Sequence, residues 1–162
     1  MRKSATFVAS LLAYLKDELL ETEVDAVVLT PRTLLEALDA GKLKGDNVER
    51  VDRGILIRRA NEEISENRAG DRRRLTTVGL FDVACLINSN IELDQADRYT
   101  DEALALAIMD LTDLVQEKLE DAPRANETGA YNVSIRSLTD VADPTSKFFG
   151  SLITIEAHLK QV

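Results

Sequence analysis

The sequence predicts an α+β domain in which about four to five strands form a mostly antiparallel sheet, with an N-terminal helix and a long amphipathic helix packed on one face. Two observations support this prediction. Strand-like segments come in consecutive pairs, and the order is helix, strand, short helix, two strands, long helix, two strands. The length of 162 residues suits a single domain, 1–162. A domain of this size buries roughly 70% of its unfolded surface, so its core needs no disulfide or metal.

The first segment, Ser4 to Leu20, predicts an amphipathic helix because its apolar residues recur at spacings of three and four. That stripe consists of Phe7, Val8, Leu11, Leu12, Leu15 and Leu19. The β-branched run from Val24 to Leu29 predicts a short strand. Thr30 and Pro31 then suit the cap and the first position of a short helix that ends at Gly41.

Two strand-like segments with a polar segment between them predict a long hairpin. The first strand lies near Ile55 to Ala60, and the second runs from Leu75 to Asn88. Apolar residues occupy odd positions of the second strand: Leu75, Phe81, Val83, Cys85 and Ile87. The polar residues from Asn61 to Asp71 predict a loop at the hairpin tip, so the two strands are expected to be antiparallel neighbours. Loops of this length are often functional.

The long helix is predicted from Asp101 to Leu119. Thr100 can accept a hydrogen bond from a first-turn amide, and the acidic residues that follow favour the positive end of the helix dipole. One apolar stripe runs along the helix: Leu104, Ala107, Ile108, Leu111, Leu114, Val115 and Leu119. The segment from Asp121 to Ala130 is predicted to be a loop.

A second strand pair completes the predicted domain. Tyr131 to Leu138 forms its first strand, Thr139 to Ser146 a turn, and Phe148 to Leu159 its second strand. The last strand alternates between apolar and polar residues, which indicates one packed face and one wetter face. Its apolar positions are Phe149, Ile153, Ile155, Ala157 and Leu159.

The net charge of −9 argues against a general nucleic-acid binder, because such affinity comes mainly from neutralising phosphates with lysine and arginine. Arginines outnumber lysines by 13 to 7, which suits a high-salt cytoplasm and an ordinary acidic protein equally well. The single cysteine, Cys85, excludes an intramolecular disulfide and is expected to be buried. No signal peptide is visible, and the apolar run from Phe7 to Leu15 is too short to span a bilayer, so we expect an intracellular protein without a membrane partner.

No catalytic or metal-binding constellation is visible in the sequence. His158 is the single histidine and lies on the polar side of the last predicted strand. Zinc sites use clusters of histidine and cysteine, and a serine triad needs an acid and a serine beside its histidine. Glycine-rich phosphate loops are absent as well. We therefore expect a protein that is not an enzyme and that takes no cofactor and no metal.

The basic run Arg72-Arg73-Arg74 predicts an interaction site, together with other charged residues across the hairpin. One interpretation is a solvated hairpin whose arginines balance nearby glutamates. The other is a docking patch for an acidic partner, such as a symmetry-related copy, because a guanidinium can grip a carboxylate through two bonds. The polar connection from Thr139 to Lys147 is expected to join this interface. The candidate interface residues are Arg58, Arg59, Glu62, Glu63, Glu66, Arg68, Arg72, Arg73, Arg74 and Lys147.

Four segments carry a resemblance to a known family: Gly54 to Arg59, Val78 to Asn88, Asp101 to Leu119 and Phe148 to Glu156. Placed between an N-terminal helix and a closing hairpin, they resemble the tail terminator (tail completion) proteins of long-tailed phages and related archaeal viruses. The resemblance implies a structural protein whose subunits form a hexameric ring on the end of the tail tube. The ring stops tube polymerisation and presents a surface to the neck of the filled head.

The resemblance also implies the partners and the location. The partners would be copies of this chain, the tail tube protein and a head–tail connector or neck protein, with DNA at most passing through the ring lumen. The protein would reside in the virion after assembly in the host cytoplasm. The acidic composition would suit a virus of a halophilic archaeal host.

Three alternatives stay open at this point. The first is a different virion connector, either a head–tail adaptor or a tail tube subunit, which would share the ring symmetry. The second is a cellular α+β binding module with a defined ligand pocket. The third is an enzyme, which would have to place His158 beside acids in a cleft.

Overall fold

The structure is a computed structural model that describes residues 3–33, 51–69, 72–89, 100–125, 130–143 and 147–159. The predicted short helix after Thr30 lies largely outside these residues. The described elements, with their bounds, are α1 (Lys3–Leu19), β1 (Ala26–Leu29), β2 (Arg53–Ala69), β3 (Arg72–Asn88), α3 (Asp101–Ala125), β4 (Ala130–Asp143) and β5 (Phe148–Leu159).

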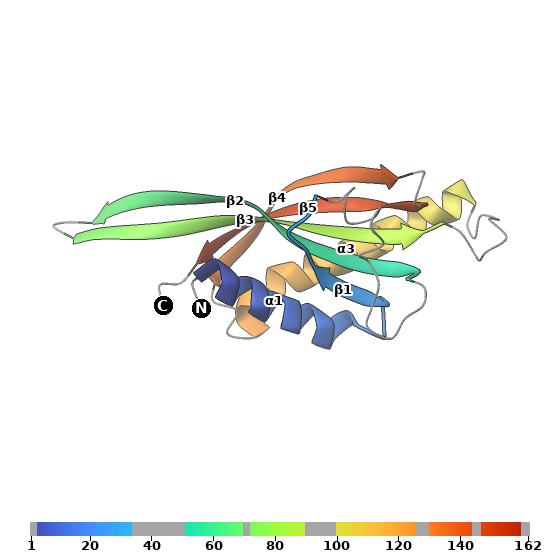
Figure 1. The fold of residues 1–162 in the computed structure, drawn as a ribbon, viewed down its shortest axis with the longest axis horizontal. Helices are drawn as coiled ribbons and strands as arrows, with labels where there is room; N and C mark the ends of the chain where they lie inside the picture. Colours follow the sequence, from blue (N-terminus) through green and yellow to red (C-terminus); the bar gives the residue numbers. More distant parts are fainter. Residues whose placement is uncertain are drawn as a thin grey trace.

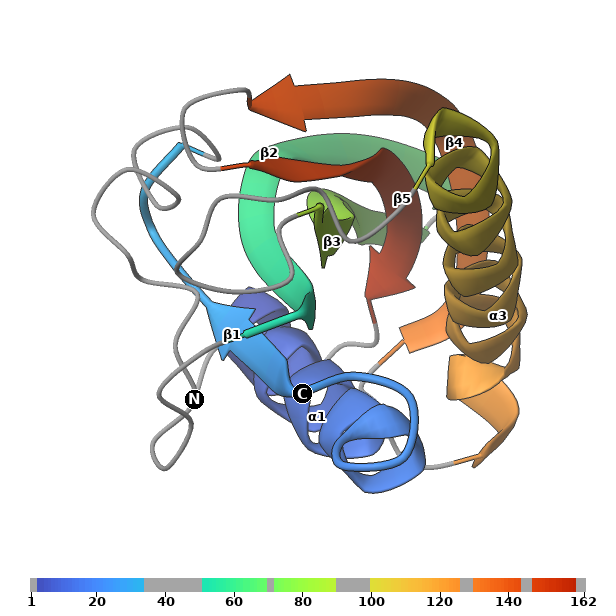
Figure 2. The ribbon, with the colours of Figure 1, turned by 90° about the vertical axis from the view of Figure 1, so that its right-hand side faces the viewer.

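One five-stranded sheet organises the chain, with the strand order β1-β2-β3-β5-β4. β1 and β2 are parallel, and every other neighbouring pair is antiparallel. The predicted α+β class with a mostly antiparallel sheet is therefore confirmed. Figure 1 shows the sheet with both helices on one side, and Figure 2 shows its strong twist, with α1 alongside β1 and α3 alongside β4.

The main core lies between the sheet and the two helices. Phe7 of α1 packs against Phe81 of β3, with ring centroids 5.0 Å apart and the rings tilted by 50°. Both side chains are fully buried. The odd-numbered apolar residues predicted for β3 from Phe81 onward, and those of β5 from Ile153 onward, all face this core. Burial of these residues provides most of the driving force for folding, at about 25 cal/mol per Å² of apolar surface.

The opposite face of the sheet carries a second, smaller apolar cluster. Its buried members are Ala26, Val51, Leu56, Ala84 and Leu86. Val28, Val141, Phe148 and Leu152 pack against them. The middle of β3 is consequently buried on both faces, at its even positions as well as at the odd positions noted in the sequence.

The helix boundaries follow the capping chemistry. The amide of Ala103 donates a hydrogen bond to Thr100 Oγ1 at 3.2 Å, which confirms Thr100 as the cap of α3. At the other end, the helix continues past Leu119 and includes Pro123, so the predicted loop was wrong up to Ala125. Proline removes only one backbone hydrogen bond there, while Leu119 and Ala122 remain fully buried and hold the last turns against the core.

Two other predicted connections are strand instead. The segment from Asn61 to Asp71 was predicted to be a loop, but β2 runs through Ala69 and β3 begins at Arg72. Likewise, β4 continues to Asp143 through most of the predicted turn. A ribbon that satisfies its backbone groups by cross-strand pairing needs no apolar alternation in its sequence, which is why the sequence pattern did not reveal it.

A short helix was predicted to begin at Thr30, but its first four residues, 30–33, are not helical. Residues 30–33 form a turn in which the amide of Arg32 donates to Thr30 Oγ1 at 3.1 Å. A threonine hydroxyl can satisfy an amide this way without a helix, which competes with the capping role that the sequence suggested. Residues 34–41 of that prediction lie outside the described residues.

Candidate functional site

The hairpin formed by β2 and β3 extends well beyond the rest of the sheet (Figure 1). The pairing of β3 with β5 ends at Thr77, opposite Leu159. Beyond that point five residue pairs, from Ser65 opposite Thr76 to Ala69 opposite Arg72, have no further partner strand within the described part of the chain. We call these ten residues the arm. At about 3.4 Å per residue, the arm reaches roughly 17 Å past the sheet.

The arm gathers half of the predicted interface residues. Arg68 lies directly opposite Arg73 in the ladder, and Arg74 is opposite Asn67. Like charges in directly opposed positions destabilise an isolated ribbon. The ten positions of the arm hold four arginines against one glutamate, in a chain whose net charge is −9. The predicted residues in the arm are Glu66, Arg68, Arg72, Arg73 and Arg74.

The remaining predicted residues lie elsewhere. Glu62 and Glu63 pair with the part of β3 that also pairs with β5, so they precede the arm. Arg58 and Arg59 lie further back along β2, opposite Asp82 and Phe81 of β3. Lys147 lies next to β5 at the opposite end of the sheet, where its carbonyl accepts a hydrogen bond from the amide of Ser89 at 2.8 Å. The structure therefore does not bring Lys147 together with the arm.

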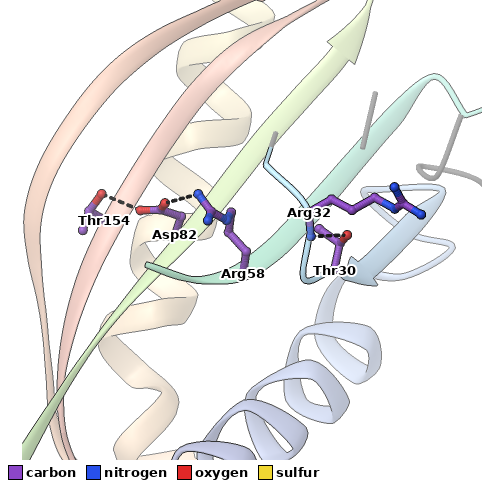
Figure 3. A network of polar contacts seen from close by, with 5 residues as sticks. All are labelled: Thr30, Arg32, Arg58, Asp82 and Thr154. Carbon is purple, nitrogen blue, oxygen red and sulfur yellow. Dashed lines mark hydrogen bonds and ion pairs between the residues drawn. The ribbon is translucent and has the colours of Figure 1, made fainter. Parts of the chain in front are cut away.

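A polar ladder crosses three strands in the part of the hairpin where β3 also pairs with β5 (Figure 3). Arg58, Asp82 and Thr154 are direct neighbours in register on β2, β3 and β5. Arg58 Nη1 lies 3.6 Å from Asp82 Oδ2, and Thr154 Oγ1 donates to Asp82 Oδ1 at 2.8 Å. Asp82 is 8% exposed, and each of the two oxygens of this buried carboxylate has a polar partner. Much of the charge of Arg58 is thus compensated within the chain.

At this ladder the pairing of β2 with β1 ends. The last residue pair between β1 and β2 is Leu29 with Ile57, and the amide of Thr30 donates to the Ile57 carbonyl at 3.0 Å. From Arg58 onward, the second edge of β2 has no partner strand among the described residues. A β-bulge follows at once, between Arg59 and Asn61, and bulges of this kind increase the local twist.

The outward side of α3 is a second surface of interest. Leu106 and Met109 are 60% and 61% exposed, although they lie one turn apart on an amphipathic helix. Acidic residues surround them on the same stripe, and all of these side chains are exposed. We call this stripe the outer face of α3. Its members are Glu102, Leu106, Met109, Asp110, Asp113, Glu117 and Glu120.

The residues with potential chemistry are separated from one another. Cys85 is buried, and burial raises the pKa of its thiol to about 12. His158 Nε2 lies 3.7 Å from Glu156 Oε1 on the face of β5 that points away from the helices. Among the residues that the structure describes, no group of three or more histidine, cysteine, aspartate or glutamate side chains could hold a metal ion. Within the same residues, neither helix combines the length and the apolar content needed to cross a membrane.

Sequence reasoning missed two of these features, although each left a signal. Asp82 is a single charge in an otherwise apolar stretch of β3, and Arg58 directly follows the apolar run Ile55 to Ile57 in β2, which is a pattern compatible with a buried ion pair. Leu106 and Met109 are large apolar residues that fall off the apolar stripe of their helix.

A scan against protein-family models found no match, and a search of curated proteins found none either.

Proposed function

We propose that this chain is a structural virion protein that closes into a ring on the end of a tail tube, ends tube polymerisation and joins the tail to the head or neck. The assignment to a tail rests on the resemblance in four sequence segments. The assembly of several copies is supported by the arm. In this proposal the chain is not an enzyme. Its partners are its own copies, the tail tube protein and a connector or neck protein, and DNA at most passes through the lumen.

The arm is the observation that carries the proposal. A two-stranded ribbon alone in water is at best marginally stable, and this one also opposes Arg68 to Arg73. Its ten residues are beyond the reach of β5, and the outer edge of β2 has no strand beside it among the described residues. A ribbon of this kind gains stability from a surface on another molecule, which favours an assembly over a monomer.

The geometry of the arm is compatible with a ring. The arm leaves the body at one end, whereas α3 lies on the body itself (Figure 1). A contact between an arm and a body joins two unlike surfaces. Two chains can exchange such contacts about a two-fold axis, or the contacts can repeat head-to-tail and close into a ring when the rotation between subunits allows. The resemblance favours the ring, because it implies a closed ring of about six copies.

The first test is the mass of the purified full chain in solution, measured in low and in multimolar salt. We expect a closed ring of defined mass in at least one condition, seen as rings by electron microscopy. Added to polymerising tail tube protein, the chain should shorten the tubes. A monomer in every condition would contradict the ring. Long self-assembled tubes would instead indicate a tube subunit.

The second test removes the arm while keeping the rest of the sheet in register. Residues 65–76 are replaced by Asn-Gly, which joins Ile64 to Thr77, a directly opposed pair, through a tight hairpin turn. We expect a folded monomer with an unchanged helical circular dichroism signal. As a control, Asn-Gly replaces only residues 70–71 and leaves all five arm pairs in place. If the shortened chain forms rings as stable as those of the full chain, the arm does not hold the ring together.

A further inference from the structure

We infer that the arm of one subunit docks on the outer face of α3 of a second copy of this chain. This inference rests on the proposed ring and specifies its contact. It starts from Leu106 and Met109, which form an exposed apolar pair on a helix whose other large apolar side chains pack on the core. Exposed apolar side chains rimmed by polar groups are typical of interaction surfaces.

The charge of this face selects the partner. The charged members of the outer face of α3, from Glu102 to Glu120, are all acidic, and Lys118 is held on another side of the helix by Glu18 of α1, at 3.1 Å. The arm has the opposite composition, with four arginines and one glutamate. Arginine also suits a surface that combines carboxylates with apolar groups, because its guanidinium is weakly hydrated and binds carboxylates in a planar fork.

The partner must be a second molecule. Figure 1 shows the arm extending from one end of the body, while the first turns of α3 lie at the opposite end. The order of the chain agrees, because Arg72 at the arm and Asn88 at the far end are the two ends of β3, and α3 begins beyond the far end. The arm of one chain therefore cannot reach Leu106 and Met109 of the same chain.

The contact is tested by charge reversal on each side. Variant A carries Arg73→Glu and Arg74→Glu in the arm, and variant B carries Asp110→Arg and Asp113→Arg on α3. Each is expected to weaken ring assembly about tenfold or more, because each sets like charges against each other. The matched control is Asp17→Arg with Glu23→Arg, which makes the same charge change at exposed positions outside α3 and should leave assembly unchanged.

Mixing variants A and B provides the decisive result. In an alternating ring, the acidic arm of A meets the basic α3 of B, and the basic arm of B meets the acidic α3 of A. Both contacts are complementary, so we expect the mixture to recover rings that neither variant forms alone. A second pair of substitutions, Leu106→Ser with Met109→Ser, should weaken assembly without changing any charge or the thermal unfolding temperature.

The outcomes separate this inference from the proposed ring. If the wild type forms rings and variant B forms them at the same protein concentration, the docking inference is overturned and the proposed ring stands. Open polymers that variant B dissolves, and that the mixture restores, would support the docking contact and overturn ring closure. A wild-type chain that stays monomeric in low and high salt would overturn both.

Discussion

Gly150 of β5 and Cys85 of β3 approach so closely that a Cβ at position 150 would overlap the carbonyl oxygen of Cys85. The close approach occurs where β3 and β5 pair, with Gly150 opposite Leu86. Because the obstacle is backbone within the central pair of the sheet, it cannot move aside as a flexible side chain could.

The first prediction follows from this contact. Gly150→Ala should lower the free energy of unfolding by about 3 kcal/mol, because the added methyl group forces the two central strands apart. Chemical denaturation measures the loss. Ala142→Ser, at an exposed position of β4 near the same end of the sheet, is the control and should change stability little. A Gly150→Ala protein as stable as the control would show that the strands can separate there at low cost.

The second prediction concerns the polar ladder. Asp82→Ala should destabilise the fold by roughly 1–3 kcal/mol, because it removes two polar contacts and leaves Arg58 without its counter-charge in a partly buried place. Thr154→Val removes one hydrogen bond and should cost about 1 kcal/mol. Urea unfolding of both single variants and the double variant gives the coupling. Purely additive effects would indicate that Thr154 contributes nothing through Asp82.

The third prediction uses an asymmetry between two buried hydroxyl groups. Thr112 Oγ1 is 2.6 Å from the carbonyl of Ile108 and 3.0 Å from Ser151 Oγ. Thr112 keeps its bond to Ile108 when Ser151→Ala is made, so that change should cost less than about 1 kcal/mol. Thr112→Val leaves the Ser151 hydroxyl buried without that partner and should cost about 1–3 kcal/mol.

Combining the two changes provides the control for the third prediction. Thr112→Val together with Ser151→Ala should be more stable than Thr112→Val alone, because no buried hydroxyl is then left unpaired. The measurement is the free energy of unfolding of all four proteins. If Ser151→Ala is the more damaging single change, the proposed asymmetry is wrong.

The fourth prediction is a pH dependence. The pKa of Cys85 is raised by burial from 9.0 to about 12, so between those values the unfolded chain loses a thiol proton that the folded chain keeps. The contribution of this thiol to the free energy of unfolding is fully present below pH 9 and is lost as the pH rises toward 12. The free energy of unfolding then falls by up to about 1.4 kcal/mol per pH unit. The free energy of unfolding of Cys85→Ala should fall less steeply with pH over this range than that of the wild type. The pKa of Tyr14 is also raised, but its effect on stability is common to both proteins.

The same burial predicts slow thiol chemistry. A disulfide reagent at pH 8 should modify Cys85 at a rate limited by unfolding, and denaturant should release the full reactivity, since the thiolate is the reactive form. Fast modification of the native protein would mean that β3 opens locally.

The sequence was sufficient where packing on a core imposes a period. Phe7, Leu11 and Leu15 predicted the buried side of α1, and the alternation from Ile153 to Leu159 predicted the buried side of β5. Thr100 marked the start of α3 through a local hydrogen bond. In each case the signal lies within a few residues of the structure that it specifies, so no knowledge of distant segments was needed.

The sequence was insufficient where pairing between distant segments decides the structure. The arm has strand geometry because Ser65 to Ala69 bond to Arg72 to Thr76, and no apolar alternation records this. Leu56 and Leu86 are buried on the second face only because the sheet order brings them together. The candidate site was predicted as a list of charges; the structure groups the arm residues and separates Lys147 from them.

The position of β5 between β3 and β4 also bears on the order of folding. β5 is synthesised after both of its neighbours, so β4 has no strand to join and β3 keeps one open edge until β5 emerges. The β2–β3 hairpin, by contrast, closes across two residues and can form early, on a timescale of about 1–10 μs. A newly made chain would therefore expose the long edge of β3 as a template for incorrect pairing during translation. Late insertion of β5 closes that edge and gives β4 its only neighbour in the described sheet.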